Sequence, residues 1–422
     1  MRTILSFGLA LLLPLSGVVQ AGDAPHGTVA PALQPFVDRQ IIAGAVALVA
    51  DKDRVLAVET VGCSSLSAKA PMQTNTLFWL ASITKTFTAT ALMMLVDEGK
   101  VNVDDPVEKY LPEFKGQQVA DATDKTRRHP PPHPVLIKEL LTHTSGLIGP
   151  NDAPIKRTNV LKEDAEQYAA APLKWEPGTR YQYSNAGINT AGRIIEVVSG
   201  LPYGQFIQQR LLEPLGMTET TFWPDARQAA RLALTSQRNK EKTALEDLPN
   251  HPDPAWLNQP TNAPSVPLIV RTYSGDALRA YPNRYAAPAS GLFSTAPDLA
   301  KFGQMMLNHG VCRGRRLVSE ASFKRMTTLA PGTVALKPAP GIGLVWFVKQ
   351  HDDEGLAAGS FGHNGARGPA LFVDPAHQLV LILLIESSDI HLLGQPRGAE
   401  QKKLRTDFYR TAIQKYGRTP RP

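Results

Sequence analysis

Residues 77–100 of the chain read LFWLASITKTFTATALMMLVDEGK. Their apolar residues recur at helical spacing, and Gly99 stands close to the end of the pattern. The segment Ser82-Ile83-Thr84-Lys85 places a serine and a lysine one turn apart on the same face. A serine hydroxyl is a poor nucleophile until a neighbouring group takes its proton, and a desolvated lysine can be that group. A serine in the first turn also holds its backbone N–H at the positive end of the helix, where an oxyanion could bind.

Apolar runs typical of strands lie on both sides of this helix. The runs at residues 44–50 and 55–61 are separated by Asp51-Lys52-Asp53-Arg54, which indicates a hairpin. Further strands are predicted towards the other end of the chain, in GLVWFVKQ (343–350), PALFVDP (369–375) and LVLILLIES (379–387). Helices are predicted at 29–40, 189–200, 297–310 and 400–416. This order favours an α/β (α+β) architecture, with one sheet built from both chain ends and a helical region inserted between them.

The predicted domain organisation is simple. Residues 1–21 form a signal peptide, because Arg2 is followed by an apolar run from Ile4 to Val19 and by the small residue Ala21. Residues 22–422 form a single catalytic domain. Its sheet-bearing part covers about 22–81 and 281–422, and its helical part about 82–280.

Two further motifs contain groups that could act beside Ser82. In Tyr183-Ser184-Asn185, a tyrosine near Lys85 could have its phenol pKa lowered and serve as a general base. A second Tyr-x-Asn tripeptide occurs at 281–283, but PGTRYQYSNAG leads into a helix and favours the first. In His363-Asn364-Gly365, a glycine-rich turn before a strand could present an imidazole and a backbone N–H to a pocket. The simpler interpretation of that motif is a surface turn beside an edge strand.

Taken in order, these motifs resemble one family, the class C β-lactamase-related serine hydrolases. The family includes D,D-peptidases, D-aminopeptidases and family VIII carboxylesterases. The resemblance covers nearly all of the chain after the signal peptide. It extends to the blocks IKELLTHTSGL, LLEPLGMTETTF, SGLFSTAPDLAKFGQMML and FGHNGARGPALFVDP. It implies a β-lactamase/transpeptidase-like fold, in which an antiparallel sheet flanked by helices meets a mostly helical region at the substrate cleft.

The resemblance also implies roles for individual residues. Ser82 is the acylated nucleophile and Lys85 its proton-transfer partner, while Tyr183 is the base for acylation and for water attack. Asn185 positions the substrate, and the backbone N–H groups of Ser82 and Ala366 form the oxyanion hole beside Gly365. Which of Lys85 and Tyr183 takes the proton during acylation stays open. His143 and Ser145 in LTHTSGL are interpreted as a structural turn.

The chain departs from the lactamase pattern at His363, where β-lactamases and many penicillin-binding proteins carry lysine. A histidine is mostly neutral near pH 7 and offers no fixed charge to a substrate carboxylate, although Arg367 lies close in sequence. We therefore predict hydrolysis of small carboxylic esters or amides. The alternatives are a peptidoglycan D,D-carboxypeptidase or D-aminopeptidase with weak β-lactamase activity, and a non-catalytic module that binds penicillin or cell-wall peptides. The presence of Ser82, Lys85 and Tyr183 together argues against the module.

Charge and composition restrict the remaining classes. Residues 397–422 carry eight basic and two acidic side chains (8 − 2 = +6), which equals the charge of the chain without Arg2 (7 − 1 = +6). The basic character therefore belongs to the C-terminal segment, and no nucleic-acid motif accompanies it. No Cys or His cluster has metal-site spacing, so neither a metal nor a cofactor is predicted. We expect a periplasmic or secreted protein without membrane insertion after signal cleavage, and leave the oligomeric state and the pairing of Cys63 with Cys312 open.

Overall fold

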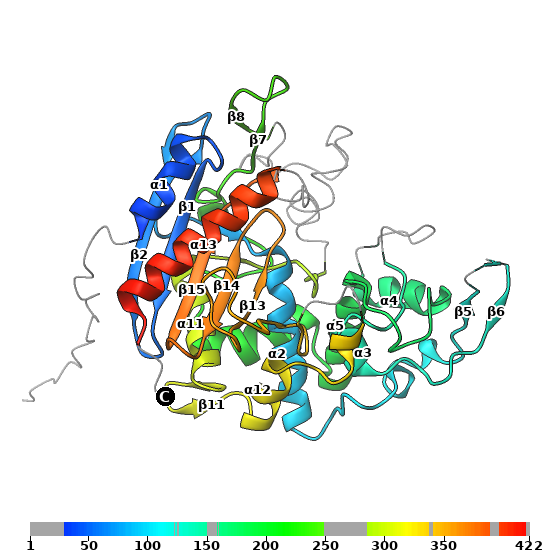
Figure 1. The fold of residues 1–422 in the computed structure, drawn as a ribbon. Coiled ribbons are helices and arrows are strands. Elements are labelled where there is room, and N and C mark those ends of the chain that lie inside the picture. The colour runs from blue at the N-terminus through cyan, green and yellow to red at the C-terminus, as the bar shows by residue number, and fades with distance from the viewer. Residues whose placement is uncertain are drawn as a thin grey trace, which may run out of the picture.

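A seven-stranded antiparallel sheet forms the centre of the computed structural model (Figure 1). The structure describes residues 29–121, 123–124, 126–149, 158, 160–248, 285–336, 341–388 and 396–418. The order of the strands, from one edge to the other, is β12 (Phe347–Val348), β13 (Phe361–Asn364), β14 (Ala370–Asp374), β15 (Leu379–Leu384), β1 (Gly44–Ala50), β2 (Val55–Ser65) and β3 (Ala70–Pro71). Strands from the two ends of the sequence meet where β1 pairs with β15, so the predicted fold class is confirmed.

The central strands are buried on both faces. All seven residues of β1 and all six of β15 are buried, which explains their continuous apolar sequences. Val46 lies opposite Leu384 in the register of the two strands. The predicted hairpin joins β1 to β2, where the Asp51 carboxylate accepts the N–H groups of Asp53 and Arg54 at 2.8 and 2.9 Å.

Helices cover both faces of the sheet and form a three-layer arrangement (Figure 1). On one face lie α1 (Ala30–Asp38) and α13 (Pro396–Tyr416). Phe36 of α1 and Phe408 of α13 belong to the same buried cluster as Leu381 of β15. On the other face, α2 (Thr84–Asp97) and α11 (Ala296–Leu307) contact residues such as Val380 and Ile382. Side chains alternate between the two faces along each strand, so the sheet contributes residues to two separate hydrophobic cores.

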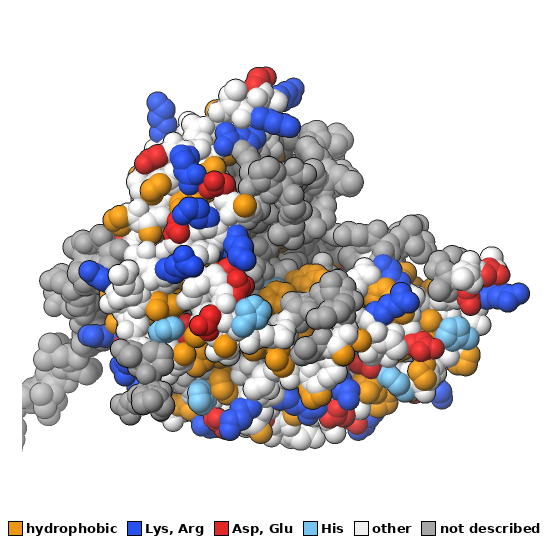
Figure 2. All heavy atoms as spheres, in the orientation of Figure 1, with side chains coloured by type: hydrophobic (Ala, Val, Ile, Leu, Met, Phe, Trp, Pro, Cys, Tyr) orange, Lys and Arg blue, Asp and Glu red, His pale blue; other side chains and the backbone are white. Residues whose placement is uncertain are grey.

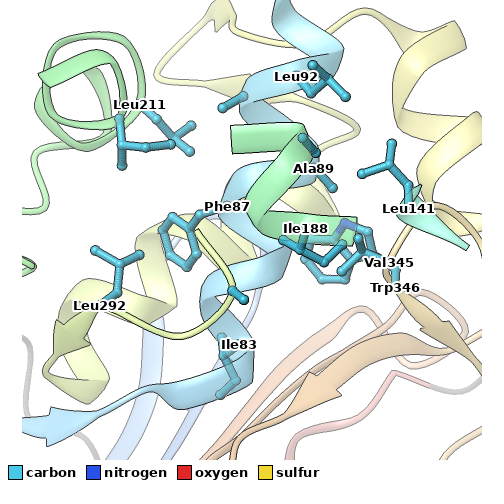
Figure 3. Close-up of a cluster of buried hydrophobic side chains, with 14 of the residues drawn as sticks. Ile83, Phe87, Ala89, Leu92, Leu141, Ile188, Leu211, Leu292, Val345 and Trp346 are labelled. Carbon is cyan, nitrogen blue, oxygen red and sulfur yellow. The ribbon is translucent and has the colours of Figure 1, made fainter. Parts of the chain in front are cut away.

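Helix α2 is buried on all sides, as Figure 3 shows for Phe87, Ala89 and Leu92, which lie among side chains of several other elements. A helix in such a position needs partners for its polar side chains. Its threonine hydroxyls find partners in the helix backbone itself. Thr86 Oγ1 donates to the Ile83 carbonyl at 2.7 Å, and Thr90 Oγ1 donates to the Thr86 carbonyl at 2.8 Å. The helix that carries Lys85 is therefore a rigid central element.

The helical side of the molecule contacts α2 from the opposite direction. Its helices are α3 (Ile137–Leu141), α4 (Leu161–Ala170), α5 (Asn185–Ser199), α6 (Tyr203–Ile207), α7 (Glu213–Leu215), α8 (Ala226–Ala229) and α12 (Glu320–Thr327). Single turns occur at η1 (Ala81–Ile83), η2 (Val107–Lys109), η3 (Pro112–Phe114), η4 (Gln208–Leu212, π-helical) and η6 (Thr333–Ala335). Two-stranded sheets pair β4 (Phe78–Trp79) with β9 (Phe293–Ser294), β5 (Val119–Ala120) with β6 (Arg128–His129), β7 (Ser236–Arg238) with β8 (Leu245–Asp247), and β10 (Val311–Cys312) with β11 (Arg315–Arg316).

Two departures from the sequence prediction have the same physical cause. Residues 77–79 were included in the helical pattern, but Phe78 and Trp79 form β4 because they pair with β9. The strand predicted over 343–350 shrinks to Phe347–Val348, because Val345 has a left-handed φ of 74° and donates its N–H to the Leu141 carbonyl. In both places a long-range backbone contact overrides a local pattern.

Several predictions fall outside the described residues, namely the signal peptide at 1–21 and the second Tyr-x-Asn at 281–283. Among the described residues, no helix is both long and apolar enough to span a membrane. Cys63 and Cys312 are both free cysteines.

Candidate active site

Ser82 and Lys85 are in direct contact at the start of α2. Ser82 lies in the turn η1, which continues into α2, and the Nζ atom of Lys85 lies 3.0 Å from its Oγ. Nζ also donates a 2.7 Å hydrogen bond to the Ala289 carbonyl. Lys85 is fully buried, and this desolvation holds its pKa well below the ordinary lysine value. A buried amine of this kind can exist in the neutral form that accepts a proton.

The backbone before Ser82 is strained. Ala81 has a φ of 46°, in the left-handed region that non-glycine residues rarely adopt. The residue is fully buried, so the surrounding packing holds this conformation. The sharp turn between β4 and η1 places Ser82 at the start of the helix. Nothing in the sequence signals it, because alanine is not a typical residue for a positive φ.

Tyr183 lies beside Lys85, as the sequence predicted. Nζ of Lys85 is 4.7 Å from the centroid of the Tyr183 ring. Tyr183 is 38% exposed, whereas the lysine is buried, so the tyrosine lies on the solvent side of the pair. Its ring contacts the ring of His143, with centroids 4.5 Å apart. His143 therefore belongs to the surroundings of the site, which its interpretation as a structural turn did not anticipate.

His363 lies on β13 and is buried, with 1% of its surface exposed. Its Nδ1 is 2.7 Å from the Asn364 carbonyl, so Nδ1 carries the proton and Nε2 is the acceptor. Burial, together with the charge of Lys85, lowers the pKa of His363 to about 3. The imidazole stacks on Phe347 at 4.5 Å and is neutral at neutral pH. The simpler interpretation of this motif, a surface turn, is wrong for the histidine itself.

The turn after β13 approaches the segment just before Ser82. A Cβ atom on Gly365 would lie 2.4 Å from the Leu80 carbonyl oxygen, so only glycine fits this close approach. Ala366 packs against the cluster that contains Trp79 and Ala81. Within the described part of the chain, the backbone N–H of Ala366 donates no hydrogen bond. A free N–H next to the serine segment is what an oxyanion hole requires.

Two further residues complete the surroundings. Asn185 is the first residue of α5, and its buried Oδ1 has no partner among the described residues. Arg367 is 2% exposed and lies close enough to the buried Glu386 to influence that carboxyl. Its charge is directed into the protein. In the described ranges, no group of three His, Cys, Asp or Glu side chains could hold a metal ion.

A model of the Beta-lactamase family matches residues 29–395. The chain belongs to the Beta-lactamase family. Protein Rv1367c of Mycobacterium tuberculosis is 31% identical over 382 residues, which cover 84% of this chain and 88% of that protein. Esterase EstB of Burkholderia gladioli is 28% identical, with the same coverage of 84% and 88%. A putative D-alanyl-D-alanine carboxypeptidase of Salmonella agona is 26% identical and covers 83% of this chain and 81% of its own. As a member of this family, the chain is a serine hydrolase.

Solved structures agree with this fold. EstCE1, a hydrolase with promiscuous acyltransferase activity, superposes with a TM-score of 0.69 at 22% identity, over 90% of this chain and 97% of its own. Simvastatin synthase from Aspergillus terreus gives a TM-score of 0.70 at 20% identity, over 92% and 97%.

The surface of this Beta-lactamase-family protein has a hollow between the sheet and helices α3 to α5. Hydrophobic side chains gather in that hollow (Figure 2). A separate cavity of about 380 Å³ between α3 and α12 is lined by none of the predicted site residues.

Proposed function

We propose that this chain is an exported serine hydrolase that forms an acyl-enzyme on Ser82 and hydrolyses small carboxylic esters. The hydrogen bond between Lys85 Nζ and Ser82 Oγ carries the proposal. Burial lowers the pKa of Lys85, which increases the fraction of neutral amine near pH 7. Since Lys85 contacts Ser82 directly, we assign to Lys85 the role of taking the serine proton.

The first half of the reaction then uses three groups. Ser82 Oγ attacks the ester carbonyl carbon while its proton moves to Lys85 Nζ. The charge that develops on the carbonyl oxygen is stabilised by the N–H groups of Ser82 and Ala366. The bond to the alcohol breaks, the departing oxygen takes the proton, and the acyl group stays on Ser82.

The second half removes that acyl group with water. Tyr183 lies on the solvent side of Lys85, and we assign to it the proton of the attacking water: the phenol gives its own proton to neutral Lys85 Nζ and takes one from the water, and Lys85 then returns its proton to Ser82 Oγ. The carbonyl carbon passes again through a tetrahedral state held by the same N–H groups, and Ser82 recovers its proton as the acid leaves. Asn185 positions the acyl group through its side-chain amide.

Esters are favoured over carboxylate-bearing substrates by the state of His363. Its low pKa keeps the imidazole neutral, so it supplies no fixed positive charge where β-lactamases carry lysine. Arg367 does not replace that charge, because it is buried and acts on Glu386. The similarity to an esterase of Burkholderia gladioli supports the same choice. Export is supported by the pattern of Arg2 followed by the apolar run to Val19.

Labelling followed by mass spectrometry tests the nucleophile. The wild type and Ser82→Ala are incubated with a fluorophosphonate probe and, separately, with a fluorescent penicillin. We expect phosphonate labelling of the wild type alone, mapped to Ser82, and hydrolysis of short p-nitrophenyl esters that Ser82→Ala abolishes while it remains folded. Release of D-alanine from a D-Ala-D-Ala peptide with little ester turnover would favour the peptidase. Absence of any labelling would favour the binding module.

A further inference from the structure

His143, in the loop after α3, is hydrogen-bonded to the two residues that flank Tyr183. His143 is 1% exposed and has a left-handed φ of 59°. Its backbone carbonyl accepts the N–H of Gln182 at 2.9 Å. Its side-chain Nδ1 accepts the N–H of Ser184 at 3.2 Å. One residue therefore accepts the N–H groups of both residues that flank Tyr183.

The segment that carries Tyr183 depends on these bonds. Residues 180–184 have no regular secondary structure, and α5 begins only at Asn185. The rings of His143 and Tyr183 also pack in a tilted arrangement, with centroids 4.5 Å apart and an interplanar angle of 38°, which adds a third contact, this one to the tyrosine itself. A side chain on an irregular segment is placed accurately only when its backbone is fixed by such contacts.

His143 is suited to holding a backbone and not to transferring a proton. Because Nδ1 accepts from Ser184, the proton of the neutral ring resides on Nε2. Nε2 is buried and has no partner among the described residues. Burial, with smaller contributions from the charges of Lys85 and His363, holds the pKa of His143 well below its ordinary range. The acceptor at Nδ1 therefore persists across the working pH range of a hydrolase.

We propose that His143 is a positioning residue for Tyr183: by accepting the N–H groups on both sides of it, His143 keeps the phenol in place for the water-attack step. This inference rests on the function proposed above. It assigns His143 an effect on Tyr183 alone, because the contact between Ser82 and Lys85 uses neither of its acceptors.

Two substitutions separate the acceptor from the ring. His143→Phe keeps an aromatic ring against Tyr183 but removes the Nδ1 acceptor. His143→Asn places an amide oxygen near the position of Nδ1, and asparagine tolerates the left-handed backbone. With a p-nitrophenyl ester, we expect His143→Phe to lower kcat by ~10- to 100-fold, the scale of losing alignment of a catalytic group. Because acylation of Ser82 is unaffected, KM should fall together with kcat and kcat/KM should change little. His143→Asn should recover most of the loss in kcat with an unaltered pH profile.

A double-mutant cycle with Tyr183→Phe makes the test specific. If His143 acts through Tyr183, adding His143→Phe to Tyr183→Phe lowers kcat no further. Multiplicative losses would overturn the proposal, since a general weakening of the fold would act on both enzymes alike. If His143→Asn is as inactive as His143→Phe and an ionisation is missing from its pH profile, His143 transfers a proton instead. Melting temperatures check that each variant is folded.

Phosphonate labelling distinguishes this proposal from the proposed function. We expect His143→Phe to be labelled at Ser82 at nearly the wild-type rate, because labelling needs Ser82 and Lys85 alone. If labelling is lost in the wild type too, the proposed function fails. If labelling slows in His143→Phe as much as kcat does, the positioning proposal fails while the nucleophile assignment stands.

Discussion

At the scale of single residues, burial sets the protonation of the site. The Nζ atom of Lys85 lies within hydrogen-bond distance of Ser82 Oγ and of the Ala289 carbonyl, and its desolvation favours the neutral amine. His363 and His143 are kept neutral chiefly by burial. The site thus combines neutral bases in a dry environment, in which a developing oxyanion is stabilised strongly by backbone N–H groups.

A pH profile tests the state of Lys85. Since the neutral amine is the active form, the rate of phosphonate labelling of Ser82 should rise with pH and level off well below pH 10.5, the ordinary lysine value. Lys85→Arg keeps the positive charge at all accessible pH values, because guanidinium does not deprotonate. We expect this variant to label at least ~100-fold more slowly, with no rise over the same range. An unchanged profile in Lys85→Arg would move the proton acceptor to Tyr183.

Residue identities were predictable from the sequence where a motif carries them, and conformations were not. The spacing of Ser82 and Lys85 indicates their contact because a helix places i and i+3 on one face. The positive φ of Ala81 and the two bonds from His143 to the Tyr183 segment depend on packing between elements distant in sequence. The motif LTHTSGL identified the loop, but its contact with Tyr183 required the fold.

At the scale of elements, the approach of β13 to η1 builds the site. The end of β13 lies against Leu80, and a glycine at 365 allows this contact. The long apolar runs that became β1 and β15 were predictable, because strands buried on both faces leave a continuous pattern. The short pairing of β4 with β9 was hidden inside a longer helical pattern.

Substituting that glycine tests the approach. Gly365→Ala adds a Cβ atom 2.4 Å from the Leu80 oxygen, so β13 and η1 must separate and the Ala366 N–H must move. We expect ~100-fold lower kcat with p-nitrophenyl esters, the scale of losing one oxyanion donor. Gly99→Ala is the matched control, because no atom lies within 4 Å of its added Cβ. It should cost about 1 kcal/mol of stability for its left-handed backbone and leave kcat unchanged. Equal kcat in the two variants would contradict this role for β13.

At the scale of the whole molecule, a buried carboxyl links the sheet to the segment beside the site. Glu386 follows β15, and its Oε1 accepts from Thr235 Oγ1 at 2.9 Å. Its backbone carbonyl accepts the N–H of Ser236, at the start of β7. The next residue, Ser387, donates its N–H to the carbonyl of Arg367, in the turn that contains Ala366. The oxyanion turn, β15 and β7 are therefore fixed to one another around a single glutamate.

The titration of Glu386 should make the stability of the whole fold depend on pH. Burial raises its pKa from 4.5 to about 7, against the opposing effect of Arg367. Between these values the Glu386 carboxyl binds more protons in the folded state than in the unfolded state, so its contribution to the free energy of unfolding falls as pH rises through this range. A shift of this size corresponds to about 3 kcal/mol. Glu386→Gln keeps an acceptor for Thr235 and cannot ionise, so in denaturant titrations its stability at pH 8 relative to pH 5 should be higher than that of the wild type. The control is Glu163→Gln, an exposed change on α4, which should keep the wild-type difference in the free energy of unfolding between pH 5 and pH 8. If Glu386→Gln also keeps that difference, another group carries the pH dependence.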